Sequence, residues 1–488
     1  MRDMPGGSGR PRIFAPLQSG LPRLVFACVV FAVLALAITT RIPKWLSDFD
    51  QSFYLTIAYD LDRHGVFSNG IFDSVDSTKE VPPPGMFFAP LYPALALAVM
   101  KLDPRFERAV TCSVEVNHGV RDGAQCEVYA RPMHLVHAAF LTLGVLAIAF
   151  AAQIILANRR AFWASGILAV ACLLPDADLF SFVMTESVTF GLYGLFGLAL
   201  VAALRPGEAR YAGAAGLTLG ALCLTRTAFV VLLPVVALLV VANGRWVSDL
   251  GAKAIGRWVA MLCVAFAVVM APWIVRNGIS LGKFGLTEEY GSAALIERTA
   301  FNTMSASEYA LAFPYCLPGI GAPLAGLLAG PDATDRFEWN KPNSFFREGR
   351  QRRVRMVEKY GRLDPNLSTI LHAEFAQDWW RHLLVSIPLA WCGMWVGGMW
   401  SLILVPALAW AAVRTARDRN FLLLFYAAPA LVMVALHGFL ANHYTRYNLG
   451  LIGPLCVAGA WALIKGTARL RRIGRAKAKP ISSSVVSN

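Results

Sequence analysis

The sequence predicts an all-α membrane protein, a polytopic bundle of about ten transmembrane helices with periplasmic juxtamembrane helices. Of its 488 residues, 56% are hydrophobic and 16% are charged, whereas a soluble domain averages about 25% charged residues. The mean hydropathy is +0.52. A chain this apolar could not cover its core with polar surface, so we expect the lipid bilayer to be its solvent.

The apolar runs that we expect to span are separated by short polar or basic stretches. They cover residues 21–42, 133–157, 161–174, 187–204, 211–224, 229–241, 258–275, 391–413, 421–439 and 449–464. The first run lacks a small-residue cleavage site, so we interpret it as an anchor and not a cleaved signal. The run 87–101 has only about 15 apolar residues, short of the roughly 20 that a span needs, and is expected to be half-embedded. Residues 382–413 are long for one helix, which predicts an embedded segment before the true span.

Short basic loops set the predicted orientation. All of the following fall on one side of the bundle: Arg159, Arg160, Arg205, Arg210, Arg245, Lys253, Arg257, Arg414, Arg417 and Arg419. By the positive-inside rule this side is the cytoplasm, together with both termini. We therefore expect a multi-pass protein of the bacterial inner membrane. The net charge of +14 lies mainly in these clusters, a pattern typical of contact with anionic membrane lipids and not with nucleic acid.

This orientation divides the chain into five parts. They are a cytoplasmic tail (1–20), an N-terminal membrane module (21–275) with a first periplasmic loop (43–131), a periplasmic loop region (276–388), C-terminal transmembrane helices (389–465) and a basic cytoplasmic tail (466–488). Nothing in the sequence indicates the oligomeric state.

The cysteines are of two kinds. Cys112 and Cys126 share the polar segment 103–130, which we expect outside the cytoplasm. We hypothesise a disulfide between them, since an oxidising compartment would keep it; a zinc pair is a weaker alternative because no second ligand pair is nearby. The others that we considered lie singly in apolar runs, which indicates packing. These are Cys28, Cys172, Cys223, Cys263, Cys392 and Cys456.

The stretch 47–58 places two carboxylates, Asp48 and Asp50, where the first span meets water. Apolar residues recur at helical spacing behind them, which predicts a short amphipathic helix along the membrane surface. Charge at the edge of hydrocarbon is costly unless it has a use, so Asp50 is a functional candidate. The alternative is that Ser47 or Asp50 only caps the helix.

Ionisable residues from separate loops are predicted to meet at the outer membrane surface. They are Asp48, Asp50, Lys79, Glu80, Asp176, Asp178, Glu186, Arg226, Arg276, His443 and Arg446. Cations hold a phosphate and a carboxylate acts as a general base, a combination suited to chemistry on an anionic lipid. A transporter would place ionisable residues in mid-span, but these spans are nearly free of charge. The pattern favours an enzyme, with a non-enzymatic transporter or flippase of a lipid-linked glycan as the alternative.

Five segments, in order, resemble motifs of the GT-C glycosyltransferases. They are Asp50–Ala58 with Pro83-Pro84 and Leu91–Pro93; Met184–Glu186; Leu224–Arg226; Pro272–Asn277 with Gly282–Phe284; and Arg446-Tyr447 before Gly453-Pro454. The similarity is to the aminoarabinose and galacturonic acid lipid A or core transferases and to the protein O-mannosyltransferases, and it fades from Thr287 to Gln377. It implies transfer of a sugar, with inversion, from a polyprenyl-phosphate donor to a lipid, glycan or protein acceptor on the periplasmic face.

The resemblance also implies roles for individual residues. Asp50 would be the catalytic carboxylate that takes the proton of the acceptor hydroxyl, and Glu186 matches a second acidic position. The positions matched to the donor phosphate are Lys79, Arg226, Arg276, His443 and Arg446. The simpler alternatives are that Glu186 stabilises a helix dipole and that the cations are ordinary residues at span ends.

Two further features bear on the substrates. The paired acidic motif of the family is Asp followed by Glu, but here Asp50 is followed by Gln51. The missing Glu weakens the expectation of a metal site, so no cofactor is required and a divalent metal is left undecided.

A basic run comprises Arg347, Arg350, Arg352, Arg353, Arg355, Lys359 and Arg362. We expect it to form a solvated amphipathic helix, with contact to acceptor phosphates as the alternative.

Overall fold

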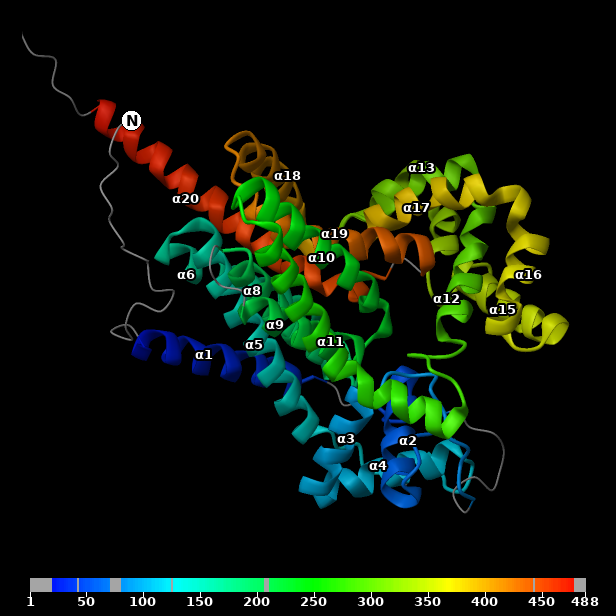
Figure 1. The fold of residues 1–488 in the computed structure, drawn as a ribbon. Coiled ribbons are helices and arrows are strands. Elements are labelled where there is room, and N and C mark those ends of the chain that lie inside the picture. Colours follow the sequence, from blue (N-terminus) through cyan, green and yellow to red (C-terminus); the bar gives the residue numbers. More distant parts are fainter. Residues whose placement is uncertain are drawn as a thin grey trace, which may run out of the picture.

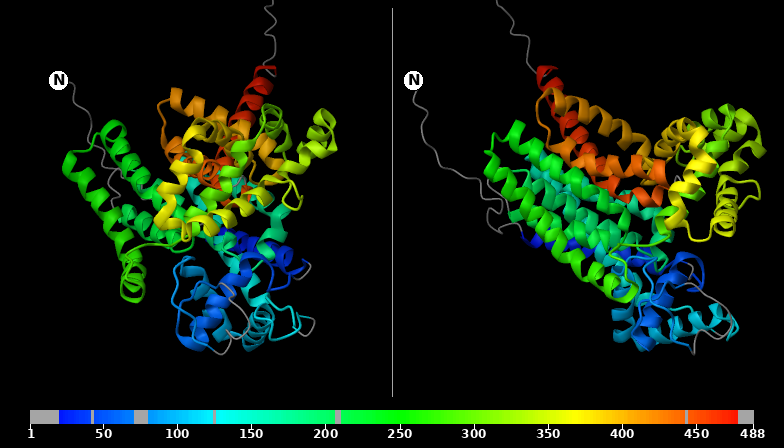
Figure 2. Two further views of the ribbon diagram at one scale, coloured as in Figure 1. Left: turned by 90° about the vertical axis from the view of Figure 1, so that its right-hand side faces the viewer. Right: turned by 45° about the vertical axis from the view of Figure 1, so that its right-hand side comes forward.

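The computed structural model describes residues 20–41, 44–70, 80–123, 126–205, 210–441 and 444–477. Within these ranges the regular secondary structure is entirely helical. Long helices form one bundle, and two groups of shorter helices lie at one end of it (Figures 1 and 2). The fold class is therefore that of an all-α membrane protein, as the composition predicts.

The helices of the bundle correspond to the predicted spans. They are α1 (Gly20–Thr39), α5 (Arg131–Leu156), α6 (Arg159–Leu173), α8 (Glu186–Ala203), α9 (Arg210–Cys223), α10 (Leu232–Ala242), α11 (Ala252–Leu281), α18 (Ser401–Arg417), α19 (Leu422–Leu440) and α20 (Ile452–Lys477). In the described parts of the chain, nine helical segments are long and apolar enough to cross a membrane. The exception in the bundle is α9, which has 14 residues.

Small residues let α9 pack into the bundle despite its length. A Cβ atom added at Gly216 of α9 would lie 2.2 Å from the carbonyl oxygen of Leu262 on α11. A Cβ atom added at Gly194 of α8 would lie 2.8 Å from the Cα atom of Gly144 on α5. Glycine at these positions lets two backbones approach closely, which matters in lipid because apolar surface alone does not drive helices together.

The first group of short helices follows α1. It consists of α2 (Phe49–His64), α3 (Leu91–Leu102) and α4 (Pro104–Asn117). With 12 residues, α3 is too short to span, as expected for the run 87–101, and its half-embedded position stays a prediction. The carboxylate of Asp103 accepts hydrogen bonds from the backbone N–H groups of Arg105 and Phe106 and so begins α4. A disulfide joins Cys112 of α4 to Cys126 and closes the polar segment before α5.

The second group of short helices connects α11 to α18. It consists of α12 (Tyr290–Arg298), α13 (Ala306–Tyr315), α14 (Gly321–Ala329), α15 (Phe345–Tyr360), α16 (Leu363–Phe375) and α17 (Trp379–Gly393). The stretch 382–413 divides into two helices, as its length suggests, and the spanning helix α18 begins at Ser401 and not at residue 391. Our interpretation of Cys392 as a packing residue is wrong: it forms a disulfide with Cys316, because the end of α17 meets the turn after α13.

Consecutive helices of the bundle run in opposite directions. The first and the last residue of each helix can therefore each be assigned to one of the two ends of the bundle. Glu186 begins α8, Arg226 precedes α10 and Arg446 precedes α20. All three therefore lie at the end that carries α2 and Asp50, together with both groups of short helices (Figure 2). The short basic loops lie at the opposite end, as the predicted orientation requires.

Candidate functional site

Four charged side chains from distant parts of the chain form one cluster at this end of the bundle. Arg446 donates from Nη2 to Oδ2 of Asp50 at 3.0 Å, and its Nη1 lies 3.5 Å from Oε1 of Glu186. Arg226 donates from Nη2 to the same oxygen of Glu186 at 2.6 Å. The structure thus brings together four of the residues that the sequence singles out. Both guanidinium groups share Glu186, and one of them also holds Asp50.

Asp50 lies in the first turn of α2, directly after a residue with unusual backbone geometry. Phe49 has φ +55°, a left-handed backbone value that residues other than glycine rarely adopt. Its ring contacts that of Phe182 edge-on, with the ring centroids 5.4 Å apart. Such strain is typical of functional sites. The Asp50 side chain is 47% exposed, and within the described residues only its Oδ2 has a hydrogen-bond partner. One carboxylate oxygen is therefore held while the other is open to solvent.

Asp48 and Gln51, which are close to Asp50 in the sequence, have surroundings that differ from those of Asp50. Asp48 is exposed, and its side chain makes no cap hydrogen bond to the helix. Gln51 is fully buried; its amide oxygen accepts from the N–H of Val183 at 3.0 Å, and its amide nitrogen donates to the carbonyl of Trp45 at 2.5 Å. An ionised glutamate here could accept from Val183 but could not donate to Trp45. Gln51 therefore ties α2 to the segment that leads into Glu186.

Glu186 is the first residue of α8, and its side chain is only 2% exposed. The helix dipole stabilises a carboxylate at this position, as the simpler alternative expects, but here the carboxylate also binds two arginines. Its second oxygen, Oε2, is buried and has no hydrogen-bond partner among the described residues. These contacts allow Glu186 to orient both guanidinium groups.

The two arginines are held by aromatic rings as well as by carboxylates. The guanidinium carbons of Arg226 and Arg446 each lie 5.2 Å from the ring centroid of Tyr447. Arg226 also donates from Nε to Thr185 at 2.8 Å. Within the described chain, Nη1 of Arg226 and Nε of Arg446 have no acceptor. These N–H groups can bind an anion while the existing ion pairs persist.

Arg276, which the sequence also placed near a donor phosphate, has different partners. It donates to the carbonyl oxygens of Gly85 at 2.5 Å and Phe67 at 2.8 Å, and to the side chain of Asn277. Its guanidinium therefore ties the end of α11 to the loop between α2 and α3. No hydrogen bond or ion pair joins Arg276 to the cluster in the part of the chain that is described. Lys79 and His443 lie outside the described residues.

Two tyrosines that the sequence did not single out lie beside the cluster. Burial raises the pKa of Tyr54 on α2, and the charge of Asp50 raises this pKa further. Burial also raises the pKa of Tyr290 on α12, and Tyr447 adds to the rise. Both phenols are therefore neutral near pH 7 and keep their O–H donors. A single tyrosine in a long outer region carries no sequence signal, so only the packing of α12 identifies Tyr290.

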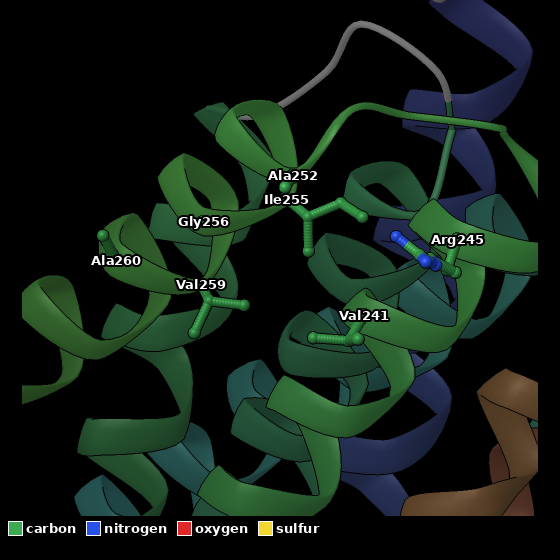
Figure 3. Close-up of a pocket in the computed structure, with 7 residues that line it drawn as sticks. All are labelled: Val241, Arg245, Ala252, Ile255, Gly256, Val259 and Ala260. Carbon is green, nitrogen blue, oxygen red and sulfur yellow. The ribbon is translucent and has the colours of Figure 1, made fainter.

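Groupings typical of a metal site are absent from the described residues: no three His, Cys, Asp or Glu side chains lie close enough to hold an ion. A cavity of about 630 Å³ lies between α10 and α11 (Figure 3). Among the residues that line it, Arg245 is the one charged side chain. Because Arg245 follows α10 whereas Arg226 precedes it, the cavity lies at the opposite end of this helix from the cluster. We assign this cavity no chemistry.

No family model and no curated protein sequence matches the chain. Solved structures that are similar to the chain include GT-C glycosyltransferases. One is ArnT from Cupriavidus metallidurans bound to undecaprenyl phosphate, with a TM-score of 0.49 and 13% identity over 94% of this chain and 63% of that chain. Another is the oligosaccharyltransferase AglB from Archaeoglobus fulgidus, in complex with an inhibitory peptide and a dolichol-phosphate, with a TM-score of 0.44 and 14% identity over 94% of this chain and 52% of that chain. The chain thus spans less than two thirds of the length of either neighbour.

Proposed function

We propose that this chain is a membrane glycosyltransferase, which moves a sugar from a polyprenyl-phosphate donor to a hydroxyl group of a lipid, glycan or protein acceptor. The observation that carries the proposal is the ion-paired cluster. In it, Asp50 is linked through Arg446 and Glu186 to Arg226. A general base and cations for a leaving phosphate are the two components that such a transfer needs. The resemblance of five sequence segments to GT-C motifs supports the same reaction.

In the proposed step the acceptor oxygen attacks the anomeric carbon of the donor sugar. The new carbon–oxygen bond forms as the bond from that carbon to the phosphate oxygen breaks, which inverts the anomeric configuration. Oδ1 of Asp50 takes the hydroxyl proton, and polyprenyl phosphate leaves with the electron pair of the broken bond. The proton gained by Asp50 balances the negative charge gained by the phosphate, so no further reactant is needed.

The arginines are assigned to the leaving phosphate. Negative charge develops there during the transfer, and a preorganised donor of this kind typically contributes about 10²–10³-fold to the rate. Nη1 of Arg226 and Nε of Arg446 supply the N–H groups. Glu186 positions both guanidinium groups in this scheme, and its burial is consistent with that role. Lys79 and His443 stay predicted partners of the phosphate.

The proposed active site faces the periplasm in a bacterial inner membrane. Short basic loops, such as the one that carries Arg159 and Arg160, lie at the opposite end of the bundle, and such loops stay in the cytoplasm. The disulfides lie in the two outer groups of helices, and disulfides persist in oxidising compartments. Two independent properties of the chain therefore support the same orientation.

Asp50→Asn tests the proposal, with Asp48→Asn as a matched control. Asp48 is a carboxylate two residues away that is exposed and does not cap the helix. We expect Asp50→Asn to lower transfer by about 10²–10⁴-fold, the usual contribution of a general base, while Asp48→Asn keeps wild-type transfer. The measurement is mass spectrometry of envelope lipids and glycans from a deletion strain that expresses each variant, with thermal unfolding of the purified proteins.

Near wild-type product from a folded Asp50→Asn variant would refute the role of Asp50. If instead the deletion strain lacked no glycosylated product, and the purified chain moved a lipid-linked glycan across vesicles unchanged, the protein would be a carrier and not an enzyme.

A further inference from the structure

Helix α15 carries all but the last cation of the basic run that the sequence predicted to be a solvated helix, and Arg362 directly precedes α16. Most of these cations are paired with carboxylates. The ion pairs are Arg352–Glu348, Arg353–Glu297, Lys359–Glu374, and Arg362 with both Glu288 and Glu289. These pairs are partly exposed: the first lies within α15, the next two join α15 to α12 and α16, and the last joins the start of α16 to the segment before α12. Four of the seven cations thus have carboxylate partners within the protein and need no ligand to balance their charge.

Arg350 differs from these paired residues. It is exposed, and its guanidinium carbon lies 3.9 Å from the ring centroid of Trp339, whose own side chain is 40% exposed. Among the described residues no carboxylate forms an ion pair with Arg350. A guanidinium that lies over an aromatic ring is held in place by the ring, while its N–H groups can still donate to an anion. Arg350 is thus a cation held on an aromatic ring, without an ion pair to any described carboxylate.

A continuous row of aromatic rings connects Arg350 to the Asp50 cluster. The ring of Trp339 lies 5.4 Å from that of Tyr444, and Tyr444 lies 5.7 Å from Tyr447. The guanidinium of Arg446 lies 5.5 Å from Tyr444 and 5.2 Å from Tyr447. The row therefore begins at the arginine that holds Asp50 and ends at Arg350.

The side chain of Glu297 on α12 is influenced by charges of both Arg350 and the Asp50 cluster. Burial raises its pKa, Arg353 and Arg350 lower it, and Asp50 raises it. The charge of the proposed general base and the charges of two α15 arginines therefore act on the same carboxylate. The ring of Phe346 on α15 stacks on Tyr444 at 4.9 Å, and Tyr444 contacts Arg446, so this part of α15 lies near the Asp50 cluster.

We propose that Arg350, held on Trp339, is an acceptor subsite that binds an anionic substituent, a phosphate or a carboxylate, on the molecule that receives the sugar. The inference rests on the proposed function, because it places the acceptor hydroxyl at Asp50 and the acceptor anion at the far end of the aromatic row. A planar guanidinium matches either anion with two parallel N–H donors. The acceptor class is therefore an anionic lipid or glycan, and Trp339 is a positioning residue for Arg350.

Binding of soluble probes tests the subsite without knowledge of the natural acceptor. The chain is reconstituted in phosphatidylcholine nanodiscs, and dissociation constants are measured by microscale thermophoresis for maltose 1-phosphate, digalacturonate and neutral maltose. We expect one or both of the charged disaccharides to bind at least about tenfold more tightly than maltose, since charge-assisted hydrogen bonds distinguish them. Which of the two binds more tightly identifies the anion as phosphate or carboxylate.

Variants then locate the binding. Arg350→Ala should weaken the preferred charged probe by about 10–100-fold, and Trp339→Ala should weaken it less, because the cation remains but is no longer held. Arg355→Ala is the matched control: Arg355 is exposed on the same helix, and it lies nine residues after Phe346, on the opposite face from the residues that contact Tyr444. It should leave binding unchanged.

The remaining outcomes separate this inference from the proposed function. Asp50→Asn should bind the charged probe as wild type does while it makes no product, so loss of product alone leaves the subsite intact. Equal binding of charged and neutral probes, or equal loss with Arg355→Ala, would overturn the inference. A loss of polyprenyl phosphate binding in Arg350→Ala, as large as its loss of the charged disaccharide, would assign Arg350 to the donor and also overturn it.

Discussion

The arginines of the Asp50 cluster differ in their partners from the arginines in the two groups of short helices around it. In the cluster, Arg226 and Arg446 contact carboxylates, and among the described residues each keeps an N–H group without an acceptor. Arg276, next to the first group of short helices, and Arg298, in the second group, bind mainly carbonyl oxygens. All four lie near helix ends. The group that accepts the hydrogen bonds of each guanidinium distinguishes the proposed chemical role from a structural one.

Arg298 shows the structural case most clearly. Its side chain is fully buried, and it donates to the carbonyl oxygens of Gly438 at 2.9 Å and His382 at 3.2 Å, and to the side chains of Asn302 and Ser386. No carboxylate of the described chain contacts it, and burial lowers its pKa to about 9. It therefore holds α12, α17 and α19 together, and the helix it fixes carries Tyr290 toward the cluster.

The largest expected effect comes from the cluster. In the proposed step, Arg446→Ala removes a cation from the leaving phosphate and from Asp50, so transfer should fall by about 10²–10³-fold. The fold should persist because Glu186 keeps its bond to Arg226. Product formation and thermal unfolding, measured on the same preparation, check both statements. A variant with nearly normal turnover would show that the phosphate is held elsewhere.

Arg298→Met should act on stability instead. It removes the donor from two carbonyls, an amide and a hydroxyl, and buried groups left without a partner cost about 1–3 kcal/mol each. Allowing for relaxation, we expect a loss of about 3 kcal/mol in the free energy of unfolding, with transfer per folded molecule retained. Thermal unfolding in detergent measures this, with Arg355→Met as the surface control. An unchanged unfolding temperature would contradict the structural role.

Arg276→Gln is expected to have the smallest effect. Glutamine can replace one of the two carbonyl contacts, so a loss of about 1–2 kcal/mol of stability should remain. The rate per folded molecule should change little, in contrast to Arg446→Ala. A rate loss as large as that of Arg446→Ala, with normal stability, would instead restore the phosphate-binding role that the sequence suggested for Arg276.

The disulfides show how far reasoning from the sequence reached. The pairing of Cys112 with Cys126 could be proposed because both lie in one short polar segment. The pairing of Cys316 with Cys392 could not, because 76 residues separate them and Cys392 lies in an apolar run. Similarly, Gln51 looked like a departure from a motif, but it accepts from Val183 and donates to Trp45, which an ionised glutamate could not do.

The sequence by itself determined the membrane class, most of the spans and the end of the bundle at which Asp50 lies, because apolar run length and loop charge act locally and through the bilayer. Only the tertiary structure decided which cations meet which anions. Asp50 and Arg446 are 396 residues apart, and no local pattern encodes a contact over that distance. Whether an arginine at a helix end meets a carboxylate, a carbonyl or an aromatic ring depends on how the helices pack.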